Sequence, residues 1–155
     1  FLQNAKKEKW FDNTLFVIVA DHSHRSPKHW DQNQPEYRKI PFVLWGNVLK
    51  DEFKGYRYKK VCSQVDIAST LLHQLGMPSG KYEWSKHLFN PHTSEFAYFE
   101  TSDGFGWIRH GQYLTYSHPM NQYYFEQTNS PEEKARLEKE GKSYLQVMFQ
   151  EYTDY

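Results

Sequence analysis

The sequence has a single cysteine, no long apolar run and no excess of charge of either sign. Cys62 cannot form a disulfide within the chain, so cysteine content does not indicate whether the protein resides in an oxidising or a reducing compartment. The longest apolar runs, 15–20 and 40–45, are far shorter than the roughly 20 residues that span a bilayer. Lys plus Arg and Asp plus Glu number 19 each, so the formal net charge is zero and no nucleic-acid partner is expected.

Aromatic residues, by contrast, are abundant. Trp, Tyr and Phe make up 18% of the chain, which argues against disorder despite a mean hydropathy of −0.90. A length of 155 residues suits one folding unit. The chain begins at Phe1, with neither an initiator Met nor a signal peptide, so we expect a piece of a longer protein.

The first half of the sequence predicts an α/β fold. Residues 14–20 and 40–45 are continuous runs of β-branched, aromatic and other apolar residues, typical of strands buried on both faces of a parallel sheet. Residues 21–36 lack any period and predict a loop at the carboxyl end of the first strand. Residues 63–76 predict a helix that ends at Gly76. One face of that helix is apolar and is formed by Val65, Ala68, Leu71, Leu72 and Leu75.

The second half predicts a small antiparallel sheet followed by a terminal helix. Short aromatic runs are separated by turn residues and cover 96–100, 105–109, 113–116 and 123–126. Ser130 and Pro131 predict the start of the helix, with a break at Gly141. We therefore expect residues 1–80 to form part of a main α/β sheet. Residues 95–155 would then form the closing antiparallel sheet and helix.

Asp21 and His22 follow the first predicted strand, where ligands of open α/β sheets bind. A carboxylate and an imidazole suit a divalent cation such as Zn²⁺ or Mn²⁺. The alternative is that Asp21 caps the next turn and His22 is an ordinary loop residue. The residues alone leave both interpretations open.

Three segments in order resemble the alkaline phosphatase superfamily. Residues 10–22, WFDNTLFVIVADH, are similar to the late metal-binding strand of its sulfatase branch, which includes the lipoteichoic acid synthase type of phosphoglycerol transferase. Residues 37–46 resemble the family's next strand, and 63–72 its helix with a central Asp, although Ser69 replaces the usual Pro. The likeness is weaker over 95–126, which resembles the closing antiparallel sheet. Ser23 departs from the glycine that many members have there.

The resemblance implies that Asp21 and His22 bind one divalent metal ion, with Mn²⁺ or Zn²⁺ favoured and Ca²⁺ as an alternative if further carboxylates join. The resemblance also implies that the nucleophile lies upstream of these residues. It would belong to a missing N-terminal part of the same chain, which is the partner expected for this piece. The parent is then a metal-dependent ester hydrolase or phosphoglycerol transferase, and this piece alone is inactive. Cys62 lacks the sequence context of a sulfatase nucleophile and is expected to be small and buried.

The segment NTLFVIVADH, residues 13–22, most resembles the lipoteichoic acid synthase branch, whose members are anchored in the membrane and act on phosphoglycerol lipids. The resemblance therefore implies a cell-envelope location, on the extracytoplasmic side of the membrane or in the periplasm. A sulfate ester is the alternative substrate, because nothing in these residues separates phosphate from sulfate.

Further candidates lie in the loop and in the aromatic segments. His29, His24 and Arg25 follow the two metal-ligand candidates and are predicted to bind the anionic substrate, the alternative being a solvated loop. Asp66 is expected to have a structural role at the start of its helix. The aromatic residues favour core packing, while an exposed row of them would indicate a glycan-binding module. A purely structural closing domain is the remaining alternative.

Overall fold

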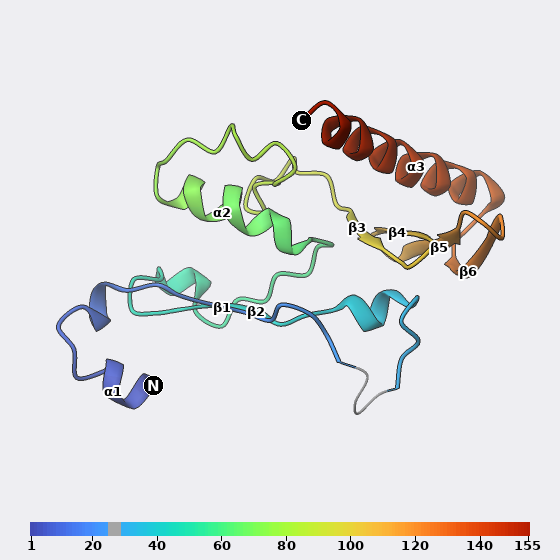
Figure 1. Cartoon of the computed structure of the whole chain (residues 1–155). Helices are drawn as coiled ribbons and strands as arrows, with labels where there is room; N and C mark the ends of the chain where they lie inside the picture. Colours follow the sequence, from blue (N-terminus) through green and yellow to red (C-terminus); the bar gives the residue numbers. More distant parts are fainter. Residues whose placement is uncertain (25–28) are drawn as a thin grey trace. The chain divides into compact units, whose positions relative to one another are not determined.

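The computed structural model describes residues 1–24 and 29–155, which separate into two compact units. The first unit comprises Phe1–Asp31 and Glu36–Lys59, and the second comprises Gln32–Pro35 and Lys60–Tyr155. Figure 1 shows the order of the elements along the chain. In the described part, no helix is both long and apolar enough to cross a bilayer.

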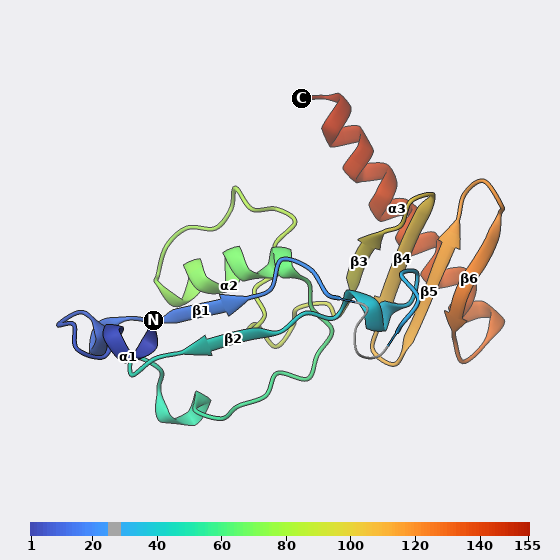
Figure 2. The ribbon, with the colours of Figure 1, turned by 60° about the horizontal axis from the view of Figure 1, so that its bottom comes forward.

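The first unit is built around two short strands, β1 (Phe16–Val19) and β2 (Phe42–Trp45). They pair antiparallel, with Phe16 opposite Trp45 (Figure 2). The expected parallel strands are therefore not found among the described residues. Parallel neighbours need a crossover connection, usually a helix, whereas the described part of the link between β1 and β2 holds only the short 3-10 turn Pro35–Arg38. The apolar pattern of the two strands predicted only that they are buried. It carried no information on their relative direction, which depends on the segment that connects them.

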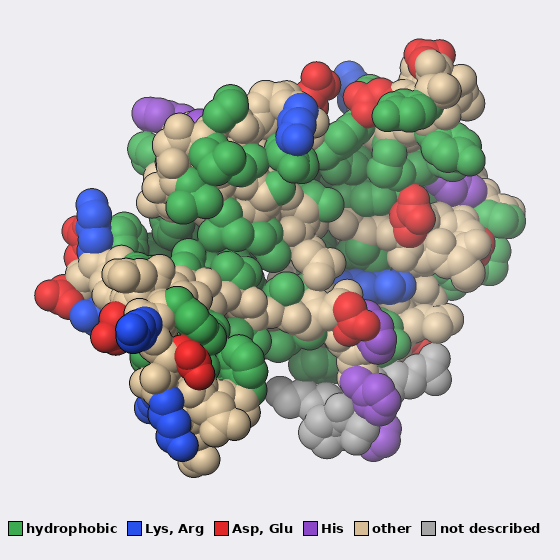
Figure 3. Space-filling view, turned by 60° about the vertical axis from the view of Figure 1, so that its left-hand side comes forward, with side chains coloured by type: hydrophobic (Ala, Val, Ile, Leu, Met, Phe, Trp, Pro, Cys, Tyr) green, Lys and Arg blue, Asp and Glu red, His purple; other side chains and the backbone are tan. Residues whose placement is uncertain are grey.

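The predicted burial of the first strand on both faces is also not observed in this chain. Val17, Ile18 and Val19 are 39%, 50% and 38% exposed. Apolar side chains are likewise visible at the surface in Figure 3. What holds the first unit is an aromatic cluster, in which the rings of Phe11, Phe16 and Trp45 lie with centroids 5.1–5.7 Å apart. A short helix, α1 (Leu2–Ala5), precedes this cluster.

The predicted helix of the middle segment is confirmed as α2 (Ile67–Gln74), preceded by a 3-10 turn over Gln64–Asp66. Gly76 has φ +64°, a left-handed conformation that ends the helix. The buried face differs from the predicted one. Val65 and Leu75 are exposed, whereas the polar residues Asp66, Ser69 and Thr70 are buried.

Polar burial on α2 is explained by hydrogen bonds to the segment that follows it. Asp66 is fully buried and accepts hydrogen bonds from the backbone N–H of Ser63 at 2.8 Å and of Lys86 at 2.9 Å. The Lys86 ammonium lies 3.0 Å from the same carboxylate. The Thr70 hydroxyl accepts from the backbone N–H of Leu88 at 3.1 Å. Asp66 therefore joins the start of α2 to residues 86–88, a structural role.

The second half of the chain folds as the sequence predicts, into a four-stranded antiparallel meander with strand order β3-β4-β5-β6. A long helix lies across one face of this sheet (Figure 2). The elements are β3 (Ala97–Glu100), β4 (Gly104–Arg109), β5 (Gln112–Ser117), β6 (Gln122–Gln127) and α3 (Pro131–Thr153). The core consists of alternate residues of the two central strands and one helix residue, namely Phe105, Trp107, Leu114, Tyr116 and Leu137.

Helix α3 begins where the sequence predicts, because the Ser130 hydroxyl accepts from the backbone N–H of Glu133 and Pro131 opens the first turn. The predicted break at Gly141 is wrong, since α3 is continuous. A Cβ atom at this glycine would lie 2.2 Å from Cε2 of the Phe105 ring. Gly141 therefore lets the helix approach the sheet.

Acidification is expected to destabilise the second unit through Glu138 on α3. Hydrogen bonds from Lys142 and then Tyr123 lower the pKa of Glu138 below its usual 4.5. A carboxylate with a lowered pKa stabilises the fold above its unfolded-state pKa, and this contribution is lost as pH falls through the folded value. Urea unfolding midpoints should therefore decrease below about pH 4.5. Glu138→Gln should make that decrease shallower, whereas Glu52→Gln, at an exposed site, should not.

Candidate metal centre

The two candidate ligands lie side by side just after β1. The backbone N–H of Ala20 still donates to the carbonyl oxygen of Pro41, so the strand pairing continues to the residue before Asp21. The backbone N–H of His22 donates to Oδ1 of Asp21 at 2.9 Å, which holds the carboxylate beside the imidazole. Oδ2 of Asp21 lies 3.6 Å from Nε2 of His22. Both side chains are open to solvent, at 88% and 76% exposed respectively.

The imidazole of His22 is oriented by its other nitrogen. Nδ1 lies 2.7 Å from the carbonyl oxygen of Ser23. A carbonyl only accepts, so Nδ1 carries the proton and the neutral ring keeps a lone pair on Nε2. Histidine ligands of metals commonly donate their second ring N–H in this way. The donor set and the tautomer therefore fit a divalent cation held between the Asp21 carboxylate and Nε2.

A complete site needs further ligands. Within residues 1–24 and 29–155, no three His, Cys, Asp or Glu side chains are grouped so that they could hold a metal ion. Zinc sites use at least three protein ligands, and harder cations need more oxygen donors. Asp21 and His22 could therefore supply at most two of the ligands that a metal ion requires.

The predicted anion-binding residues lie in the loop that follows. His24 and His29 are exposed, and Arg25 lies outside the described residues. His29 has φ +52°, which few residues other than glycine adopt. Backbone strain of the kind seen at His29 often accompanies a functional position.

Beyond the loop, the carbonyl oxygen of Asn33 accepts a hydrogen bond from the hydroxyl of the buried Thr115 at 2.8 Å.

The remaining His and Cys candidates have other surroundings. His73 and His87 stack at a centroid distance of 4.3 Å. Desolvation and the neighbouring His73 lower the pKa of His87. Cys62 is exposed, not buried as the sequence suggested, because it lies in the extended segment before α2. Desolvation and Asp66 raise the pKa of its thiol, which disfavours the reactive thiolate.

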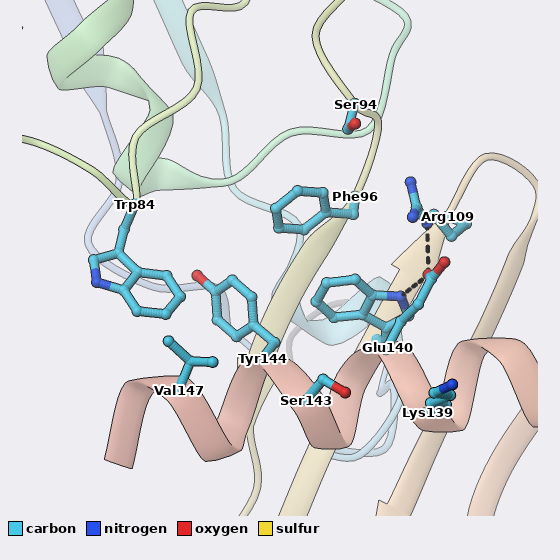
Figure 4. Close-up of a pocket in the computed structure, with 10 residues that line it drawn as sticks. Trp84, Ser94, Phe96, Arg109, Lys139, Glu140, Ser143, Tyr144 and Val147 are labelled. Carbon is cyan, nitrogen blue, oxygen red and sulfur yellow. Dashed lines mark hydrogen bonds and ion pairs between the residues drawn. The ribbon is translucent and has the colours of Figure 1, made fainter. Parts of the chain in front are cut away.

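Core packing is confirmed for part of the aromatic set of the second unit: Phe105, Trp107 and Tyr116 lie in its core, and Phe96, Tyr98, Tyr123 and Tyr144 pack against it. A groove of about 480 Å³ lies beside α3 and was not predicted from the sequence (Figure 4). Its lining includes Arg109, Glu140 and Tyr144, none of which the motifs single out. The available signal was spacing: Trp107 and Arg109 share one strand face, and Glu140 and Tyr144 one helix face.

Comparisons with known proteins bear on the family and the fold of the chain. Residues 1–77 match the Sulfatase family model. A crystal structure described as a protein in the alkaline phosphatase superfamily from Vibrio parahaemolyticus has the same fold, with a TM-score of 0.61 and 19% sequence identity. The match covers 95% of this chain and 39% of that one. The chain is therefore similar to the Sulfatase family over its first 77 residues and shares the fold of this neighbour.

The Sulfatase match contains all three segments that carry the superfamily resemblance, including Asp21 and His22. The structural match also covers the second unit, where the sequence resemblance is weak. No curated protein matches the chain at a significant level. The chain spans well under half the length of its structural neighbour, so the activity of a whole superfamily enzyme enters below as a proposal.

Proposed function

We propose that this chain forms part of a metal-dependent enzyme that hydrolyses or transfers phosphoryl or sulfuryl esters, with Asp21 and His22 as two ligands of its metal ion. The observation that carries the proposal is their pairing after β1, with Nε2 of His22 left to bind and Oδ2 of Asp21 at 3.6 Å. The Sulfatase match over the same residues supports it.

A bound divalent cation would act as a Lewis acid and stabilise the charge of the transferring group. Asp21 would offer a carboxylate oxygen and His22 its Nε2, while the Ser23 carbonyl would keep the imidazole in the right tautomer. His24 and His29, with Arg25, would bind the anionic substrate and donate hydrogen bonds to it. The nucleophile would come from an N-terminal part of the same chain, so these 155 residues alone would be inactive.

The favoured metal is Mn²⁺ or Zn²⁺, because a carboxylate and an imidazole suit either. The favoured substrate is a phosphoglycerol lipid, as in the lipoteichoic acid synthase branch, and the favoured location is the extracytoplasmic face of the membrane. Both are supported by the amino-acid sequence of residues 13–22, NTLFVIVADH. A sulfate ester is the alternative substrate.

The test compares metal content and turnover in the full-length protein. Asp21→Ala combined with His22→Ala is expected to weaken binding of Mn²⁺ or Zn²⁺ by at least about tenfold and to abolish turnover, since two ligands are lost. Plasma mass spectrometry and titration calorimetry measure the metal. Phosphodiester and sulfate-ester substrates, assayed in parallel, identify the substrate class.

A matched control is His92→Gln, which alters an exposed histidine in the second unit and should leave metal binding and turnover unchanged. Full metal content and activity in the double variant would show that Asp21 and His22 are scaffold residues. That result would refute the proposal.

A further inference from the structure

The groove beside α3 is a second candidate binding site, and it lies wholly within the second unit. It has a volume of about 480 Å³ and is open on one side. Figure 4 shows α3 along one side, Phe96 and Arg109 from the sheet region opposite, and Trp84 at one end. A volume of this size falls in the range of small-ligand sites.

The groove presents aromatic rings held in fixed orientations. Phe96 and Trp107 stack at a centroid distance of 4.8 Å, and Tyr144 packs edge-on against Phe96. Trp84 packs edge-on against Tyr144 at 4.7 Å and is only partly buried. The indole N–H of Trp84 donates to the carboxylate of Glu151 at 2.6 Å, which fixes the ring without occupying its face. The site is therefore pre-organised, which lowers the entropic cost of binding.

Polar groups lie along the same groove. Oε2 of Glu140 accepts from Nε1 of Trp107 and from Nε of Arg109, both at 2.9 Å. Oε1 of Glu140 has only the distant Nε of Arg136, at 4.0 Å, so it can accept another hydrogen bond. Lys139 is exposed and has no ion pair or hydrogen bond among the described residues. The groove thus combines the partly exposed indole of Trp84 with a free acceptor and a free donor.

This combination matches a pyranose ring. Such a ring has an apolar face of C–H groups, which packs on aromatic rings, and a rim of hydroxyls, which both donate and accept. A hydrocarbon chain would make no hydrogen bonds to the free oxygen of Glu140 or to the Lys139 ammonium, whereas sugar hydroxyls can bond to both. A nucleic-acid strand would bring phosphates to a site that contains Glu140 and lies next to Glu151.

We propose that this groove binds a saccharide, with one pyranose ring packed against the indole of Trp84 and its hydroxyls bonded to Glu140 and Lys139. The site is separate from the proposed metal centre in the first unit. None of the metal-ligand candidates lines the groove, so either proposal can fail without the other.

The experiment is saturation-transfer NMR on the full-length protein, with the pentamers of β-1,4-linked glucose and of β-1,4-linked N-acetylglucosamine as probes. Ring stacking predicts the strongest transfer to the C–H protons of one sugar face. Trp84→Ala is expected to weaken binding by about tenfold, whereas Trp84→Phe should retain part of it, because a smaller ring still stacks.

Two further variants keep the test independent of a folding defect. Ser143→Arg adds a long side chain at an exposed position of the groove lining and should weaken binding about as much as Trp84→Ala. Tyr152→Ala removes an aromatic ring that is 81% exposed on the same helix and lies outside the groove lining, so binding should be unchanged.

The proposal is overturned if neither saccharide shows transfer at millimolar concentration, or if Trp84→Ala and Ser143→Arg bind both probes as the unaltered protein does. It is also overturned if the groove binds the apolar dye anilinonaphthalene sulfonate but neither sugar. The site would then be an apolar docking surface.

Discussion

Replacing Asp66 with Ala is expected to destabilise the second unit by about 3–5 kcal/mol, the cost of leaving one partner of a buried ion pair alone. Asp66 is fully buried, and the Lys86 side chain is 13% exposed. The substitution removes the acceptor for two backbone N–H groups, those of Ser63 and Lys86, as well as the partner of the ammonium. Helix α2 and residues 86–88 lose their shared anchor.

Urea unfolding followed by circular dichroism measures this effect. The matched control is Asp51→Ala, which removes an exposed carboxylate paired with Lys54 and should leave the free energy of unfolding close to that of the unaltered chain. Asp66→Asn should be intermediate, because the amide oxygen can still accept one backbone hydrogen bond. Equal stability of the Asp66→Ala and Asp51→Ala variants would contradict a structural role for Asp66.

Gly141→Ala is expected to destabilise the chain by about 1–3 kcal/mol, the usual cost of forcing an extra methyl group into a packed core. The sign is opposite to that for an ordinary helix interior, where replacing Gly with Ala stabilises by about 0.5–1 kcal/mol. A Cβ atom would lie 2.2 Å from the fully buried ring of Phe105, so α3 or the ring must shift.

Thermal unfolding of three proteins tests this sign. Gly80→Ala is the control, because a Cβ there has no heavy atom within 4 Å, and its melting temperature should match that of the unaltered chain. A higher melting temperature for Gly141→Ala would mean that helix propensity outweighs the contact with Phe105. The close packing of α3 on β4 would then be wrong.

Patterns that depend on near neighbours in the sequence were sufficient for the second half of the fold. Alternating aromatics separated by turn residues predicted β3 to β6, and Ser130 with Pro131 predicted the start of α3. These signals need only hydrogen bonds and side chains a few residues apart. The reason for a glycine at position 141 inside α3 could not be found this way, because it lies in the contact with Phe105, far away in the sequence.

The first half shows where such patterns fail. The apolar run in β1 indicated burial on both faces, but burial depends on what covers the strand, and Ile18 is 50% exposed in this chain. The direction of β1 relative to β2, which is antiparallel, depends on the segment that connects the two strands. At the candidate metal centre, the sequence predicted Asp21 and His22 as candidate ligands, and the structure shows that their side chains are neighbours. It could not predict the Ser23 carbonyl that orients the imidazole, since that contact is set by local backbone geometry.

The two-stranded sheet of the first unit has a consequence for handling the protein. In the described structure β1 and β2 pair only with each other, so each keeps one side of backbone N–H and C=O groups without a strand neighbour. The central residues of β1 are valine and isoleucine, carry no charge and are well exposed. Open strand edges of this composition are templates for edge-to-edge aggregation. Self-association of this chain should therefore start at β1, and a lysine in place of Ile18 would suppress it.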